Sequence, residues 1–143
     1  MRQAQTMKDK VKFGIIEFLC IVWLLGFAVQ AERYVQLHHD IDWARQGFER
    51  IDTTCYLITG RTATGTPTHY GVAACNPHLG ECVELYTLEG EYLGLFEVCD
   101  TGSASGLVEG TSIDIWMPSM EEAQEWMTYT QGQVYAKFIK GEG

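Results

Sequence analysis

Two aspartates in strand-like surroundings are the residues of this chain whose type and position suit acid–base catalysis. Asp114 stands in residues 111–117, and the strand period of two places it on one face with Trp116, opposite Ile113, Ile115 and Met117. Aspartate is uncommon in strands. A carboxylate beside an indole suits a sugar, because the ring stacks on the aromatic face while the acid exchanges a proton at the glycosidic oxygen. A solvated aspartate on a half-buried strand is the alternative.

Asp100 is the second candidate. It follows a strand-like stretch and precedes Thr101, Gly102 and a segment rich in glycine and serine up to residue 110. An aspartate in this position often forms a turn by hydrogen bonding to its own backbone. If folding brings Asp100 beside Asp114, the two carboxylates resist ionising together, which raises one pKa and leaves an acid protonated near neutral pH.

Two further groups of residues suggest a metal at first sight. Cys75, His78 and Cys82 are closely spaced, and residues 38–40 read His-His-Asp. Zinc motifs usually present two close pairs of ligands, and the second pair is missing here. Residues 38–40 fall on a predicted helix, where a solvated face is the ordinary interpretation. We therefore predict no metal site.

The elements that must position these side chains are mainly strands. Short glycine, asparagine, proline and threonine turns separate six strand-like stretches, which are residues 54–59, 70–74, 82–87, 92–98, 112–117 and 133–139. This spacing favours a barrel. One short helix interrupts it after Pro118, because Ser119 and Glu122 form a capping box and Met120, Ala123 and Met127 form an apolar stripe. The β-domain is expected to span residues 53–140.

The first 52 residues form a different region. A basic start is followed by residues 13–29, which are apolar apart from Glu17 and suit either a cleaved signal peptide or a signal anchor within residues 1–31. Residues 32–52 carry a helical apolar stripe and are expected to form a stalk. Both interpretations predict export of the β-domain to the extracellular or periplasmic face, secreted or held to the membrane by its N-terminal segment.

Charge and cysteine content narrow the function further. The chain has a net charge of −9, and residues 32–143 carry 6 basic and 17 acidic side chains, so nucleic acid is not an expected partner. An even number of cysteines in a small exported domain predicts two disulfides. The candidates are Cys55, Cys75, Cys82 and Cys99, and three pairings are open.

Four blocks, taken together, resemble the 3D (Asp-Asp-Asp) domain of bacterial cell-wall proteins, which also forms the catalytic part of the membrane-bound lytic transglycosylase A family. The resemblance covers about residues 54–139 and includes a helix with Glu121-Glu122-Ala123. The blocks read Thr62-Ala63-Thr64, Ala74-Cys75-Asn76-Pro77-His78-Leu79-Gly80, Val98-Cys99-Asp100-Thr101-Gly102 and Ile113-Asp114-Ile115-Trp116.

The resemblance implies a six-stranded double-psi β-barrel with a substrate groove, and lytic transglycosylation of the MurNAc–GlcNAc bond of peptidoglycan without a metal or cofactor. Position by position, it makes Asp114 the catalytic acid/base and Asp100 the residue that tunes or orients it. The first family aspartate falls on Asn76, which keeps the shape and loses the charge. Further contacts to the sugar, or to the catalytic acid, are expected from Asn76, Thr62, Thr64 and Trp116.

Two other functions remain open at this stage. An inverting glycoside hydrolase on the same barrel needs two carboxylates about 6.5–9.5 Å apart with a water between them. A cell-wall glycan-binding module without catalysis is the second alternative, and Asn76 in place of aspartate favours it. In all three cases the partner is the peptidoglycan glycan strand.

Overall fold

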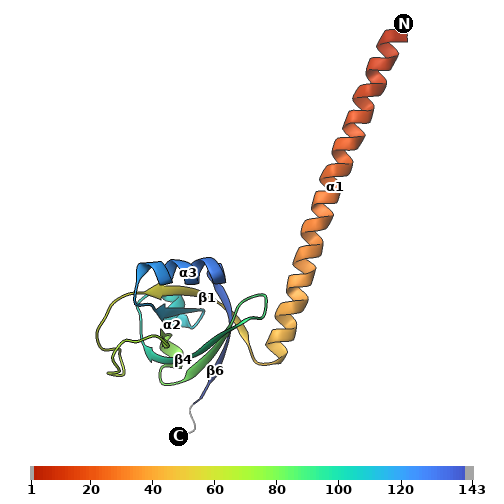
Figure 1. Cartoon of the computed structure of the whole chain (residues 1–143). Helices are drawn as coiled ribbons and strands as arrows, with labels where there is room; N and C mark the ends of the chain where they lie inside the picture. Colours follow the sequence, from red (N-terminus) through yellow and green to blue (C-terminus); the bar gives the residue numbers. More distant parts are fainter. Residues whose placement is uncertain (1, 141–143) are drawn as a thin grey trace. The chain divides into compact units, whose positions relative to one another are not determined.

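A computed structural model describes residues 2–140, with side chains from residue 14 onward. The elements follow the chain in the order shown in Figure 1. They are α1 (Arg2–Arg45), β1 (Glu49–Tyr56), β2 (Val72–Ala74), the 3₁₀ helix η1 (Asn76–His78), β3 (Cys82–Tyr86), β4 (Tyr92–Asp100), α2 (Ser105–Glu109), β5 (Ser112–Trp116), α3 (Met120–Thr130) and β6 (Gln133–Ile139).

The chain divides into two compact units, and the second begins at Trp43. The first unit is helix α1 up to Asp42, which continues without a break past residue 31. Residues 14–45 of α1 are long and apolar enough to cross a membrane, a property shared by signal sequences near an N-terminus. This helix is compatible with the predicted export.

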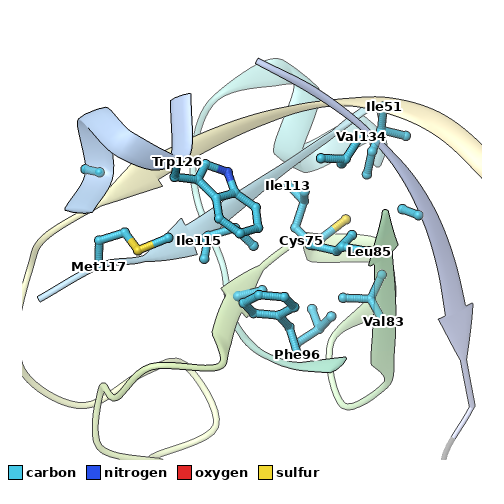
Figure 2. Packing of buried hydrophobic residues seen from close by; sticks show 14 residues of the cluster. Ile51, Cys75, Val83, Leu85, Phe96, Ile113, Ile115, Met117, Trp126 and Val134 are labelled. Atoms are coloured by element: carbon cyan, nitrogen blue, oxygen red, sulfur yellow. The ribbon is translucent and has the colours of Figure 1, made fainter. Parts of the chain in front are cut away.

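The second unit is a closed barrel of six strands in the order β1-β5-β2-β4-β3-β6, which confirms the predicted six-stranded barrel. The pairs β1/β5 and β2/β4 are parallel, and the other four are antiparallel. Apolar residues at alternate strand positions fill the interior (Figure 2). Within β5, Ile113 and Ile115 point inward as predicted, and both are fully buried. The first strand begins at Glu49, five residues earlier than expected.

Helix α3 forms where the capping box predicts it. The Ser119 hydroxyl accepts a hydrogen bond from the Glu122 N–H at 3.2 Å. The helix packs on β1, and Trp126 reaches the barrel core (Figure 2). Its indole N–H donates to the Thr53 hydroxyl at 3.1 Å. The two shorter helices, η1 and α2, are not predicted from the sequence. Each spans five residues or fewer, too short for an apolar period to show.

The expected disulfides are wrong, because all five cysteines are free thiols. Cys75 lies in the barrel core, Cys99 belongs to a separate outer cluster, and Cys55 on β1 faces the Ala123 carbonyl of α3 at 3.9 Å. Cys82 opens β3. The barrel thus distributes the thiols among different packing environments, where a buried cysteine acts as a small apolar residue. Burial raises the pKa of Cys75 and of Cys55 to about 11, so both stay protonated at neutral pH.

Candidate functional site

The site is built on strand β2, which lies between β5 and β4 in the barrel. Ala74, the last residue of β2, is the register partner of Asp114 on β5 and also of Asp100 on β4. Register partners on neighbouring strands present their side chains to the same face of a sheet. Strands lie about 4.8 Å apart, so the two aspartate backbones are separated by about 10 Å, with a methyl group between them.

A β-bulge on β4 makes this alignment possible. The parallel register runs Val72 with Glu97 and Ala73 with Val98, and then skips Cys99 to pair Ala74 with Asp100. In a regular strand, Asp100 would face the core as Val98 does, two residues before it. The extra residue turns Asp100 to the outer face and leaves Cys99 there as well. The bulge therefore brings the second carboxylate to the face that carries Asp114.

Asp114 is half-buried and held from the other side by β1. Its register partner on that strand is Thr54, whose hydroxyl donates to the carboxylate Oδ1 at 3.0 Å. Burial raises the pKa of the Asp114 carboxyl, the Thr54 hydrogen bond partly opposes the rise, and the negative charge of Asp100 adds to it. The net direction is upward, as a proton donor for neutral conditions requires.

Asp100 has a different surrounding, in which donors engage both carboxylate oxygens. Oδ1 accepts from the backbone N–H of Ala63 at 3.1 Å and of Thr101 at 2.9 Å, and Oδ2 accepts from the Tyr56 hydroxyl at 3.0 Å. Burial and this hydrogen bond raise the pKa of Tyr56, so the phenol remains a donor. Asp100 is thereby oriented by three donors from three parts of the chain.

Both aspartates line one cavity of about 370 Å³. The other residues that line it are Tyr56, Ile58, Gly60, Arg61, Thr68, Ala74, Thr101, Gly102 and Leu107. A cavity of this size accommodates a sugar unit, since ligand pockets typically measure about 300–1,000 Å³. The two acids that lie 14 positions apart in the sequence thus meet at one concave surface, as the sequence hypothesis requires.

The other residues expected at the site lie around the cavity and do not line it. Thr62 is buried, and its hydroxyl lies 3.3 Å from that of Thr64, which in turn lies 3.2 Å from the hydroxyl of Thr66. The Thr64 N–H donates to the Cys99 carbonyl at 3.1 Å. These threonines fasten the loop before β2 to the bulged end of β4, and the loop carries the Ala63 N–H to Asp100.

Asn76 and Trp116 also have partners inside the protein. The Asn76 side-chain amide is hydrogen bonded to the backbone of Gly102. Trp116 is only 8% exposed, packs with Val72 and Cys99, and donates its indole N–H to the Ile58 carbonyl at 3.1 Å. Both side chains therefore hold the walls of the cavity, and little of the Trp116 ring is open to a stacking sugar.

Sequence reasoning missed three residues that belong to the site. Thr54 and Tyr56 sit at alternate positions on the outer face of β1, a pattern visible in the sequence once the strand is known to begin at Glu49. Arg61 lies in an irregular loop, where no pattern marks it, and is the one basic residue among those that line the cavity. Its guanidinium donates to the Gly65 carbonyl at 2.8 Å.

Comparisons of this chain with models of protein families, with curated proteins and with solved structures find no match.

Proposed function

We propose that the barrel domain is a lytic transglycosylase that cleaves the MurNAc–GlcNAc bond of peptidoglycan, with Asp114 as its general acid and base. The observation that carries the proposal is the alignment of Asp114 and Asp100 on either side of Ala74, facing one sugar-sized cavity. The resemblance to the 3D domain supports the same assignment. It also implies that the barrel strands are connected in a double-psi topology.

One carboxyl group performs both proton transfers in this mechanism. Protonated Asp114 first donates its proton to the glycosidic oxygen as the bond to the MurNAc anomeric carbon breaks. The resulting carboxylate then removes the proton of the MurNAc C6 hydroxyl, whose oxygen closes a 1,6-anhydro ring on that carbon. The proton lost in the first step is regained in the second. This cycle needs an acid whose pKa is raised toward neutrality, and burial and Asp100 both act on Asp114 in that direction.

The surroundings of Asp100 favour this mechanism over an inverting hydrolase. A hydrolase of that type needs a second carboxylate that accepts a proton from a water. Both oxygens of Asp100 are already engaged by Ala63, Thr101 and Tyr56. A carboxylate held in this way acts as a fixed negative charge that keeps the proton on Asp114 and stabilises the positive charge that develops on the sugar.

A substrate in the cell wall agrees with the export that the N-terminal region predicts. Helix α1 contains a segment long and apolar enough to cross a membrane, and its start is basic. A basic flank that stays in the cytoplasm leaves the barrel on the outer side of the membrane, where the wall lies. The acidic barrel gains no attraction to an anionic polymer, so recognition depends on the shape of the cavity and on local contacts.

The decisive experiment incubates the full-length protein in detergent with purified peptidoglycan and analyses released fragments by mass spectrometry. We expect products with anhydro ends, one water lighter than hydrolysis products, and we expect Asp114→Asn to lower their release about 10³-fold. Asp52→Asn is the matched control, because Asp52 is exposed on β1 and its carboxylate contacts Gln133 outside the cavity.

The other outcomes separate the remaining functions. Reducing ends in place of anhydro ends identify a hydrolase. Binding of glycan without any release identifies a wall-binding module, and equal release by wild type and Asp114→Asn removes Asp114 from the mechanism.

A further inference from the structure

The side-chain amide of Asn76 and the backbone of Gly102 form a reciprocal pair of hydrogen bonds. Asn76 Nδ2 donates to the Gly102 carbonyl at 2.9 Å, and the Gly102 N–H donates to Asn76 Oδ1 at 2.9 Å. A primary amide carries a donor and an acceptor side by side, so it can satisfy both backbone groups at once. An ionised carboxylate accepts and cannot donate, and would make only one of the two bonds.

This pair of hydrogen bonds lies next to the strand ends that carry the two aspartates. Asn76 opens η1 two residues after Ala74, and Gly102 follows Asp100 by two residues. The parallel pairing of β2 with β4 ends at Ala74 and Asp100. The Asn76 amide therefore forms two hydrogen bonds just beyond the last β2/β4 pair. These bonds link the turn after Asp100 to the segment that follows β2, the strand between the two aspartates.

A second contact holds the same turn. A Cβ on Gly102 would lie 2.3 Å from Leu107 Cδ1, a distance that no packing tolerates without movement. Leu107 is buried in α2 and lines the cavity together with Gly102. The turn after Asp100 thus lies against Leu107 and is also hydrogen bonded to Asn76.

One of the three donors to Asp100 belongs to this turn. The Thr101 N–H, which lies between Asp100 and Gly102 in the chain, donates to Asp100 Oδ1 at 2.9 Å. A shift of Gly102 moves that N–H and changes the orientation of the carboxylate. Asn76 itself is partly buried, and one donor and one acceptor of its amide are already used on Gly102.

We infer that Asn76 is a positioning residue, which fixes the Asp100–Gly102 turn and through it the charge beside Asp114, and is not a ligand of the sugar. The inference rests on the proposed function and deepens it. It also gives a reason for asparagine where the 3D domain carries aspartate, because in this chain the residue donates to the Gly102 carbonyl.

The test compares Asn76→Ala and Asn76→Asp with wild type in the full-length protein in detergent. A misplaced catalytic group lowers turnover more than binding, so we expect Asn76→Ala to reduce kcat about tenfold or more and to change KM by less than about twofold. Gln133→Ala is the control, because it removes another side-chain amide with two partners, Arg50 and Asp52, outside the cavity. Its kcat should equal that of wild type.

Asn76→Asp supplies a signature that a general loss of stability does not produce. The ionised carboxylate repels the Gly102 carbonyl, whereas the protonated carboxyl donates to it and restores both bonds. The kcat of this variant, divided by that of wild type at each pH, should therefore rise as the pH falls. Dividing by wild type removes the pH dependence of the groups that the substitution leaves unchanged.

Hydrogen exchange tests the same contact without substrate. We expect the protection of the Gly102 N–H to fall about tenfold or more in Asn76→Ala, with the amides of the barrel core unchanged. A raised KM with unchanged kcat overturns the inference and makes Asn76 a sugar ligand. Unchanged Gly102 exchange and kinetics overturn it as well. If wild type cleaves no wall, the proposed function fails, and the exchange measurement still decides whether Asn76 holds the turn.

Discussion

Two hollows of the barrel domain differ in size and in the residues that line them. The larger, of about 940 Å³, lies beside α3 and contains Trp126, three tyrosines and three glutamates. The smaller, of about 370 Å³, contains Asp100 and Asp114. The three tyrosines are Tyr70, Tyr92 and Tyr129, each more than half exposed. Volume alone would select the hollow beside α3 as the reaction site.

The arrangement of the acids selects the smaller hollow. Asp114 is half-buried on a strand, has a fixed donor in Thr54 and faces a second carboxylate across one residue. The glutamates beside α3 are exposed on a helix surface, and Glu122 is occupied with capping the helix. Backbone register holds a strand side chain more tightly than a helix surface holds a long glutamate, so reacting groups are better placed in the barrel wall. The environment of the titratable groups therefore outweighs the volume around them in locating the reaction site.

Removing carboxylates from each hollow in turn tests directly which of the two is the reaction site. Asp114→Asn should lower the release of wall fragments about 10³-fold, because general acid–base catalysis contributes about 10²–10⁴-fold. The double variant Glu121→Gln, Glu125→Gln should stay within about twofold of wild type. Fragment release measured by mass spectrometry decides, and a loss in the double variant equal to that of Asp114→Asn moves the site to the hollow beside α3.

Asp100→Asn should have the next largest effect, about 10- to 100-fold on kcat at neutral pH. The amide keeps the shape and removes the negative charge that helps to raise the pKa of Asp114. The pKa of Asp114 then falls, so the high-pH limb of the activity profile moves to lower pH. Profiles of kcat against pH for the variant and wild type measure this shift, and a limb that moves upward contradicts the assigned role.

Trp126→Phe tests whether the hollow beside α3 serves the stability of the fold or takes part in the reaction. The indole is 7% exposed, packs against Phe96 and donates to the Thr53 hydroxyl, which the phenyl ring leaves buried without a donor. We expect the free energy of unfolding to fall by about 2 kcal/mol. Urea titration measures the loss, while kcat per folded molecule should stay unchanged. A fall in kcat of more than about tenfold, with folding intact, gives this hollow a part in the reaction.

The smallest effect concerns the stability of wild type and Asp114→Asn at different pH. Because the folded state raises the pKa of Asp114, it holds the proton more tightly than the unfolded chain does. The stabilising contribution is complete below the unfolded pKa of about 3.9 and is lost as the pH rises through the folded value. Asp114→Asn should therefore melt above wild type at neutral pH, with a difference that shrinks toward pH 4. A lower melting temperature at neutral pH would show that the carboxylate stabilises the fold.

The sequence alone determined the features that follow from local period and local hydrogen bonding. Alternation within residues 112–116 sets which side chains of β5 face the core, so Asp114 had to face the other way. Ser119 and Glu122 determine the start of α3 by the same kind of short-range rule. An apolar run after a basic start likewise predicts a long N-terminal helix.

Only the tertiary structure decided which of these features meet. The placement of β2 between β4 and β5 depends on the closure of the whole barrel, and the bulge at Cys99 depends on pairing with β2. No local pattern in residues 92–100 predicts that one position is skipped. The cysteines illustrate the same limit, since their even number suggests pairs while the strands direct the thiols to different environments. Short-range rules act within one strand or one helical turn, whereas a site made from four strands requires the register between them.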